Sequence, residues 1–308
     1  MSSSSAPNVG SIVIPHYGDP QPTLTLIESL LPQLGTAWEI IVADDHSPQP
    51  FPEAHGVRVV RRDANGGFGK NCNTGAAEAR GELLLFLNSD LEVGPTFLAD
   101  LVAAAAPWQP CVAGPRMLDH AGRDSFSARH FPKPSHQIVE WLVPLAGLRH
   151  LPALHTAVGH DMDAHRATSA LPVDWLVGAV LLLPRAEFDA VGGFDERFFM
   201  NAEEIDLQRR LRDRGIPRVF LPTVTVTHEG GGSSASERRR QWLVDGRWRY
   251  AGKWGGTRRL KAGLSAATLV NLLWGLARRV AGRPIHPWAD ARTEWQLIWP
   301  RKGRQRQP

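Results

Sequence analysis

Short apolar runs that end in polar residues recur along the chain. The clearest run is Leu83–Leu87, five large apolar residues followed directly by Asn88, Ser89 and Asp90. A run without polar alternation predicts a strand that is buried on both faces, as in a parallel sheet. Similar runs predict further strands at 9–14, 39–43, 57–60, 111–114 and 219–227, with one more apolar stretch at 173–183.

Segments with helical spacing of apolar residues lie between these strands. Residues 24–34 carry such a stripe, and helices are also predicted at 70–80, 98–106, 186–191 and 203–214. Strands that alternate with helices predict an α/β fold with a mostly parallel sheet flanked by helices. Such sheets bind their ligands at the carboxyl ends of the strands.

Residues 115–170 interrupt this alternation. They are rich in histidine, proline and arginine and show neither a helical nor a strand period. A long segment of this kind is usually functional or mobile. We therefore expect a long excursion that passes over the ligand-binding edge of the sheet.

Composition places the chain among globular proteins. It has 308 residues, of which 43% are hydrophobic and 21% charged, enough for one large domain and a smaller one. Two cysteines, Cys72 and Cys111, do not make a disulfide framework and favour a reducing compartment. Residues 1–8 are serine-rich, are expected to be flexible, and show no signal-peptide pattern.

Charge is distributed unevenly between the two parts of the chain. Residues 238–308 hold 17 lysines and arginines, only three acidic residues, and seven of the 11 tryptophans. We therefore expect a catalytic domain at 9–236 and a basic, Trp-rich helical extension at 237–308. Such an extension suits an anionic membrane surface or, equally, an ordinary helical or oligomer contact. No base-reading motif accompanies the charge, so a nucleic-acid partner is not expected.

One segment of the extension is free of charge. Residues 262–277 are 16 uncharged residues in a row. A membrane-spanning helix needs about 17–25 residues. The segment therefore suits a buried or interfacial helix.

Polar loops should converge on one edge of the sheet. They lie at 15–19, 44–47, 65–70 and 88–90, with a fifth that follows His228. The Asp90 carboxylate could hold a divalent cation, or Ser89 and Asp90 could simply turn the chain. The acids Glu203, Glu204 and Asp206 could carry chemistry, or could complement the dipole at the start of a helix.

Four segments together resemble one enzyme family. They are Ser11–Pro15, Asp44–Ser47, the stretch from Asn65-Gly66-Gly67-Phe68-Gly69 to Asn88-Ser89-Asp90, and the stretch from Gly192-Gly193-Phe194-Asp195 to Glu203-Glu204-Ile205-Asp206. In this order and spacing, over residues 9–235, the chain resembles the inverting family 2 glycosyltransferases of the GT-A fold, and most nearly the bacterial rhamnosyltransferase-like members. That fold is Rossmann-like and binds nucleotide-diphospho-sugars.

The resemblance implies a reaction and a set of partners. A sugar would pass with inversion from a nucleoside-diphosphate donor, dTDP-rhamnose or a UDP-sugar, to an acceptor hydroxyl on a glycan or lipid-linked acceptor. The product would belong to cell-envelope polysaccharide or glycolipid. Work of this kind places the protein in the cytoplasm, at or near the inner face of the cell membrane. The oligomeric state is not predicted.

The resemblance also implies roles for individual residues. Glu204 takes the position of the catalytic base, with Glu203 as the alternative in a shifted register. A divalent Mn²⁺ or Mg²⁺ would be held by Asp90 and His228. Asp44 would accept a hydrogen bond from the nucleobase. Donor-binding positions are Pro15, His16, Tyr17, Asp44, Asn65, Gly67, Lys70, Asn88, Ser89 and Asp90, and the acceptor and sugar pocket would involve Trp175, Gly178 and Phe199.

Supporting roles and alternative functions complete the expectations. Asp45 and Ser47 would support their loop, with an Asx-type turn preferred for Asp45, and Asp206 would pair with an arginine such as Arg210. Asn88 and Glu204 stand where the family pattern has aspartates, so a non-catalytic or weakly active sugar-nucleotide binder is the alternative. A nucleotidyltransferase is disfavoured, because residues 14–20 lack a glycine-rich, basic loop.

Overall fold

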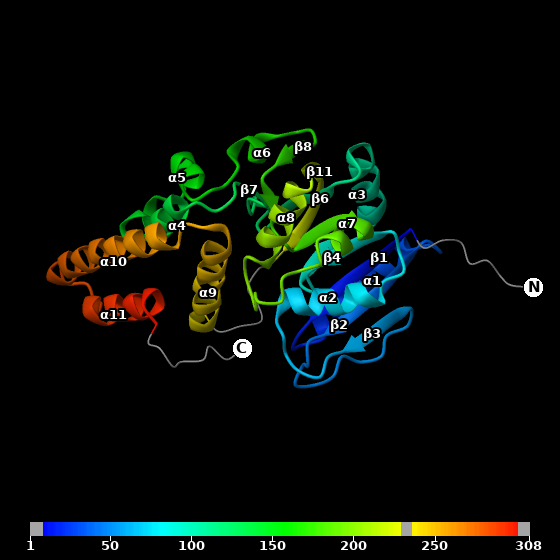
Figure 1. The fold of residues 1–308 in the computed structure, drawn as a ribbon, viewed down its shortest axis with the longest axis horizontal. Coiled ribbons are helices and arrows are strands. Elements are labelled where there is room, and N and C mark those ends of the chain that lie inside the picture. Colours follow the sequence, from blue (N-terminus) through cyan, green and yellow to red (C-terminus); the bar gives the residue numbers. More distant parts are fainter. Residues whose placement is uncertain (1–8, 229–235, 301–308) are drawn as a thin grey trace, which may run out of the picture.

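A central sheet forms the body of the molecule. The computed structural model describes residues 9–228 and 236–300 (Figure 1). Within these ranges the sheet has nine strands in the order β3-β2-β1-β4-β10-β6-β11-β5, with β8 paired to β11. The strands are β1 (Gly10–His16), β2 (Trp38–Asp44), β3 (Val57–Arg61), β4 (Leu83–Leu87), β5 (Leu91–Val93), β6 (Val112–Leu118), β8 (Leu171–Val173), β10 (Val180–Pro184) and β11 (Arg218–His228).

Strand directions place the expected loops on one edge. The pairs β1–β2, β1–β4, β2–β3 and β6–β11 are parallel, whereas β10 is antiparallel to both of its neighbours. The carboxyl ends of β1, β2, β4 and β11 therefore point the same way. The predicted α/β fold with a mostly parallel sheet is confirmed.

Helices cover both faces of the sheet. They are α1 (Gln21–Leu30), α2 (Phe68–Glu78), α3 (Phe97–Ala105), α7 (Arg185–Ala190) and α8 (Glu203–Asp213), with short 3-10 turns at Leu31–Gln33 and Ala106–Trp108. Successive residues of β4 enter opposite cores: Leu85 and Leu87 pack in one, and Leu84 and Phe86 in the other. This two-sided burial explains the unbroken apolar run of β4.

The excursion at 115–170 has more structure than the sequence predicts. β6 runs on to Leu118, and the segment then forms β7 (Ala128–Arg129), α4 (Pro134–Trp141), a 3-10 segment at Val143–Leu148, α5 (Pro152–Ala157) and α6 (Met162–Arg166). β7 pairs with β9 (Trp175–Leu176). These elements have eight residues or fewer, which is too short for a helical period to stand out in the sequence.

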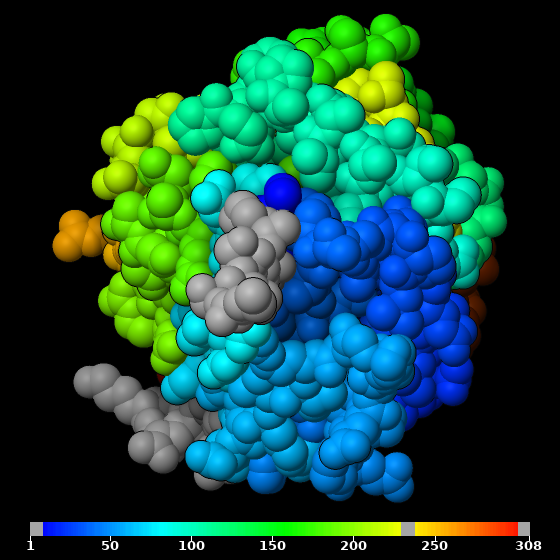
Figure 2. Space-filling view, turned by 90° about the vertical axis from the view of Figure 1, so that its right-hand side faces the viewer, coloured from blue at the N-terminus to red at the C-terminus, as the bar shows by residue number. Residues whose placement is uncertain are grey.

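The C-terminal helices pack against this excursion. They are α9 (Ser236–Trp254), α10 (Thr257–Val280) and α11 (Pro287–Ile298). Their shared core contains Trp141 of α4 together with Val244, Leu260, Leu264 and Ile298. Figure 1 shows α10 and α11 side by side, away from the strands. Figure 2, from the opposite end, shows a surface built mainly by the N-terminal half, with the orange helices only at its rim.

Candidate active site

The carboxyl ends of β1 and β2 are bound together by backbone hydrogen bonds. Strand β1 continues two residues beyond the predicted end, so His16 belongs to the strand and not to the loop. Its carbonyl accepts from Asp45 N at 3.0 Å, and the next loop joins in through Gly18 N, which donates to Ser47 Oγ at 3.0 Å. Two of the expected loops therefore meet.

Pro15, His16 and Tyr17 lie in different environments. Pro15 and His16 are buried within β1, whereas Tyr17 is exposed. The His16 ring contacts Thr23 Oγ1 through Nδ1 at 2.9 Å and packs edge-on against Phe51. Burial lowers the pKa of His16. Of these three side chains, only Tyr17 is open to a ligand at this edge.

Asp44, and not Asp45, forms the turn at this edge. Asp44 makes the turn, because its Oδ1 accepts from Ser47 N at 2.8 Å and its Oδ2 from Phe51 N at 3.1 Å and from Arg61. Burial opposes ionisation, but these hydrogen bonds outweigh it and lower the pKa of Asp44. The carboxylate is fully buried. A nucleobase could reach Asp44 only if this network opened.

Asp45 instead holds the glycine-rich loop. Its carboxylate accepts from Gly67 N at 2.7 Å and Gly66 N at 2.9 Å, and pairs with Arg62 Nε at 2.8 Å. Gly67 has φ +86°, and a Cβ there would lie 1.9 Å from the carbonyl oxygen of Phe199. Only glycine fits this position. The Asx-type turn expected for Asp45 is therefore wrong, whereas its support of this edge is observed.

Asn65 and Lys70 flank the same loop. The Oδ1 atom of Asn65 is buried without a hydrogen-bond partner. Lys70 Nζ forms an ion pair with Glu196 at 3.2 Å across a partly exposed surface. An exposed pair of this kind is weak, so Lys70 can exchange its partner for a phosphate.

Asp90, His228 and Asn88 come together although they are distant in sequence. β5 pairs with β11 and brings His228 opposite Leu91. His228 Nε2 lies 3.2 Å from Asp90 Oδ1 and 3.3 Å from Asn88 Nδ2. Burial opposes ionisation, but the contact with His228 outweighs it and lowers the pKa of Asp90. Ser89 is half-buried beside them. The glycine- and serine-rich loop after His228 lies outside the described residues.

Glu203 and Glu204 begin α8 and point in different directions. Glu203 is 4% exposed and lies against Gly69 of α2, whereas Glu204 contacts Gly178. Burial, followed by the charge of Glu204, raises the pKa of Glu203 to about 8. Burial also raises the pKa of Glu204, and the positive charge of Arg129 opposes that rise. One carboxyl oxygen of each residue is buried and has no hydrogen-bond partner among the described residues.

Gly178 provides the space that Glu204 occupies. A Cβ on Gly178 would lie 3.0 Å from Glu204 Cβ. The next residue, Ala179, accepts a hydrogen bond from Asn88 N at 2.9 Å. Glu204 therefore contacts the residue next to Ala179, and Ala179 is hydrogen-bonded to the strand end that carries Asn88 and Asp90.

The two aromatic residues expected in the acceptor and sugar pocket, Trp175 and Phe199, lie in different environments. Trp175 is buried and donates its Nε1–H to His130 O at 2.9 Å. Phe199 is half-buried, accepts from Phe68 N at 3.0 Å, and packs on the Trp242 ring at 5.4 Å. Phe199 thus joins the glycine loop to α9.

The turn before α8 is held from the C-terminal side. Asn201 has φ +70° and Ala202 has φ +73°, a conformation that is costly for residues other than glycine. A Cβ on Gly246 of α9 would lie 2.5 Å from Asn201 O, so α9 approaches this turn closely. The predicted pair is confirmed, since Arg210 Nε contacts Asp206 Oδ2 at 2.8 Å.

Sequence reasoning missed several residues that shape the site. Arg62, Gln208 and Arg129 carry no motif. Gln208 donates to Leu176 O at 2.7 Å and accepts from Leu176 N at 2.8 Å, which locks α8 to β9. Arg129 reaches the site only because β7 pairs with β9. The one available signal in the sequence concerns Gln208, a polar residue one helical turn after Glu204.

Comparison with known proteins agrees with this geometry. Residues 11–154 match the family described as "Glycosyl transferase family 2". The chain is 29% identical over 243 residues to "N-acetylglucosaminyl-diphospho-decaprenol L-rhamnosyltransferase" of Mycobacterium tuberculosis, which covers 68% of this chain and 74% of that protein. It is 28% identical over 246 residues to "O-antigen biosynthesis protein RfbC" of Myxococcus xanthus, which covers 74% of this chain and 18% of that protein.

A solved structure shares the fold. The crystal structure of GalNAc-T7 with UDP, GalNAc and Mn²⁺ superposes with a TM-score of 0.54 at 17% identity, over 79% of this chain and 47% of that one. The predictions of a GT-A fold and of nucleotide-sugar-dependent glycosyl transfer are confirmed. Residues 11–154 therefore match glycosyl transferase family 2, the chain has the GT-A fold, and it is similar to bacterial rhamnosyltransferases.

Proposed function

We propose that the protein transfers a sugar with inversion from dTDP-rhamnose or a UDP-sugar to a saccharide carried on a lipid diphosphate, during cell-envelope glycan synthesis. The mycobacterial relative is named for such an acceptor, and the Myxococcus relative for O-antigen biosynthesis. The observation that carries the proposal is the position of Glu204. It is a half-buried residue with one buried carboxyl oxygen, in contact with Gly178 and next to the strand end that bears Asn88 and Asp90.

Glu204 would act as the general base. The acceptor hydroxyl gives its proton to the Glu204 carboxylate as its oxygen attacks the anomeric carbon. The bond between that carbon and the donor diphosphate breaks on the opposite face, and the diphosphate leaves with the electron pair. A raised pKa brings the base closer to neutral pH, where proton transfer is more effective.

Asp90 and His228 fit the requirements of a divalent cation, with Asn88 beside them. The Oδ1 atom of Asn88 is a buried oxygen without a partner, and a cation would satisfy it. Among residues 9–228 and 236–300 no cluster of three His, Cys, Asp or Glu side chains could hold a metal. Diphosphate oxygens of the donor would supply the remaining ligands, as is usual for Mg²⁺. When bound, Mn²⁺ or Mg²⁺ would neutralise the leaving diphosphate.

The exposed side of α10 and α11 would lie on an anionic membrane from the cytoplasmic side. Leu273, Val280 and Trp288 are 67%, 90% and 65% exposed, and Arg279 and Arg283 lie beside them. Basic helices with exposed tryptophan suit the lipid interface. This position would bring the site close to a lipid-linked acceptor.

Helix α10 is also long and apolar enough to span a membrane, the one such helix in the part of the chain that the structure describes. The middle of the helix is nevertheless tied to the protein. Asn271 Nδ2 donates to Trp141 O at 3.0 Å, and Val143 N donates to Asn271 Oδ1 at 2.8 Å. These bonds favour a helix that lies at the interface.

Turnover of a panel of sugar nucleotides tests the function. The panel contains dTDP-rhamnose and common UDP-sugars, offered with a lipid-diphosphate saccharide and Mn²⁺ or Mg²⁺. We expect one donor to be consumed, a product of inverted anomeric configuration, and loss of activity with EDTA that Mn²⁺ restores. Donor binding without turnover in every combination would instead support a non-catalytic sugar-nucleotide binder.

A further inference from the structure

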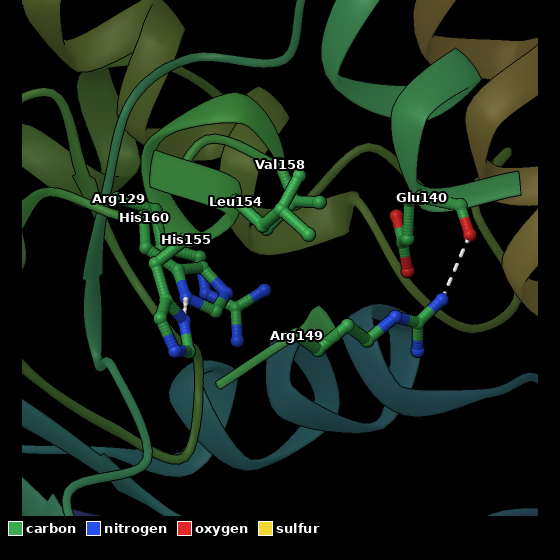
Figure 3. Close-up of a pocket in the computed structure, with 7 residues that line it drawn as sticks. All are labelled: Arg129, Glu140, Arg149, Leu154, His155, Val158 and His160. Atoms are coloured by element: carbon green, nitrogen blue, oxygen red, sulfur yellow. Dashed lines mark hydrogen bonds between the residues drawn. The ribbon is translucent and has the colours of Figure 1, made fainter. Parts of the chain in front are cut away.

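A basic cavity lies beside the catalytic helix, away from the edge that would bind the donor. Its volume is about 140 Å³, and Arg129, Arg149, His155 and His160 line it with two apolar residues and Glu140. Figure 3 shows Arg129 and both histidines on one side, and Arg149 extending toward Glu140 on the other. A space of this size is roughly that of several water molecules, so it can admit phosphoryl groups.

Arg129 is held in place by backbone pairing, a hydrogen bond and a ring contact. Its backbone forms bridges with Trp175 on one side and His160 on the other. Its Nε donates to Phe126 O at 3.0 Å, and its guanidinium lies 5.6 Å from the Trp175 ring centroid. Within the described ranges, its terminal nitrogens have no hydrogen-bond partner and no ion pair. A half-buried guanidinium in this state is suited to an anion.

The carboxylate at the cavity does not cancel the positive charge. Glu140 pairs with Arg247 of α9, whereas Arg149 donates to the Glu140 backbone carbonyl at 2.9 Å. Among the residues that the structure describes, Arg149 therefore has no ion pair either. Arg129 and Arg149 thus face the cavity without an ion pair among the described residues, although Arg129 lies within electrostatic reach of Glu140 and Glu204.

The histidines contribute hydrogen bonds and not charge. His155 Nδ1 and His160 Nδ1 lie 3.0 Å apart, so one donates to the other. Burial, followed by the charge of Arg129, lowers the pKa of His160 to about 3, and burial lowers the pKa of His155. Both rings are neutral at neutral pH. The cavity therefore takes its positive charge from the arginines.

The cavity lies on the same side of the molecule as the proposed base. β9 pairs with Arg129 through Trp175 and is locked to α8 through Gln208. Gln208 also donates to the backbone carbonyl of Glu204 at 3.1 Å. An anion bound at Arg129 would therefore lie next to the base and not at the end of β4.

We propose that this cavity binds the diphosphate of the acceptor, with Arg129 and Arg149 as its ligands. The inference rests on the proposed function, because it gives a binding site to the diphosphate of the acceptor proposed there. It predicts that an acceptor with a diphosphate is used in preference to the same saccharide without one. It also separates two diphosphates: the donor's at the end of β4, and the acceptor's at β7.

Direct binding of inorganic pyrophosphate tests the site without turnover. Calorimetry on the full chain, without metal or donor, should show binding. The double variant Arg129→Gln, Arg149→Gln should bind at least about tenfold more weakly, since two charge-assisted contacts are lost. Arg129→Lys keeps the charge and should lose less, and Arg166→Gln, an exposed arginine on α6, is the matched control.

Two further arms identify the source of the anion. UDP with Mn²⁺ should not displace pyrophosphate, and the KM for a diphosphate-bearing acceptor should rise in the double variant far more than the KM for the same saccharide without diphosphate. Absence of pyrophosphate binding, unchanged binding in a folded double variant, or displacement by UDP would overturn the inference. Failure of every donor to turn over, with pyrophosphate binding intact, would instead overturn the proposed function.

Discussion

The position of the Glu204 side chain depends on the absence of a side chain at Gly178. Gly178 has no side chain, and Glu204 occupies the space where one would be. The neighbouring acid Glu203 faces the opposite way, toward α2. Two adjacent carboxyl groups therefore have different environments, and under the proposed function Glu204 is the one that meets the acceptor.

Replacing Gly178 by alanine should reduce activity more than stability. The new Cβ would lie 3.0 Å from Glu204 Cβ and push the carboxyl out of line. We expect the turnover number to fall about tenfold to a hundredfold, because small displacements at a reacting centre are costly. Gly94→Ala, where a Cβ meets open space, should leave turnover unchanged. Equal turnover of the two variants would contradict the contact.

Glu203 should make stability depend on pH. Burial and the charge of Glu204 raise its pKa to about 8, above the unfolded value near 4.5. Between these two values the unfolded chain loses a proton that the folded chain keeps, so stability falls as pH rises through this window. Each pH unit of that window is worth about 1.4 kcal/mol.

Glu203→Gln removes this dependence. The melting temperature of the variant relative to wild type should therefore rise between pH 5 and pH 8.5, by at least about 3 °C. Scanning calorimetry at both pH values checks the sign. A difference that is constant or that shrinks over the range would show that Glu203 is ionised in the folded protein.

At the scale of elements, α9 supports the catalytic helix. Asp206 of α8 is fully buried and receives Lys253 Nζ at 2.7 Å and Trp254 Nε1 at 2.8 Å, both from α9, besides Arg210. Gly246 lets α9 approach the turn at Asn201. The C-terminal extension therefore contributes to the geometry of Glu204.

Asp206→Asn should destabilise the protein. It removes the negative charge that Lys253 and Arg210 share in a buried network, at a cost of about 3 kcal/mol in the free energy of unfolding. Urea denaturation measures this cost. Arg197→Gln breaks an ion pair whose arginine is 71% exposed, and it should change the urea midpoint far less than Asp206→Asn does. A similar cost for both variants would argue against the support role.

The longer strands of the sheet could be predicted from the sequence because their burial leaves a local signal, whereas the three-residue strands β5 and β8 were not predicted. β4 is buried on both faces, and its apolar run shows it directly. The short helices α4, α5 and α6 leave no comparable period. Which of Asp44 and Asp45 forms the turn could not be predicted, because two adjacent aspartates have the same chemistry. They differ only in which backbone groups fold toward them. Arg129 becomes a site residue only through strand pairing with distant segments.

At the scale of the whole molecule, the charge asymmetry of the sequence has a structural counterpart. The basic helix α10 and its neighbour α11 project from the excursion and leave apolar and tryptophan side chains exposed. The basic cavity at Arg129 lies between α8 and the C-terminal helices. Helix α4 links the cavity to these helices, because its Glu140 pairs with Arg247 of α9. The proposed membrane face, the proposed acceptor cavity and the proposed base would thus follow one another across the protein.

Binding to anionic vesicles should depend on this face. Each arginine near an anionic surface contributes about 1 kcal/mol, so Arg279→Gln with Arg283→Gln should lower the partition coefficient about thirtyfold in flotation. High salt should weaken wild-type binding. Arg123→Gln with Arg166→Gln, which removes two exposed charges elsewhere, is the control. Equal loss in both pairs would mean that net charge matters and not this face.

Single-turnover transfer by Glu204→Gln, compared with Glu203→Gln, tests the central claim most directly. Both substitutions keep the side-chain shape, and both remove one carboxylate. We predict that Glu204→Gln slows transfer about a hundredfold to ten-thousandfold with donor affinity unchanged, the range expected for loss of a general base. Glu203→Gln should keep transfer within about tenfold of wild type. Retained transfer in Glu204→Gln, or its loss in Glu203→Gln alone, would contradict the assignment of Glu204 as the base.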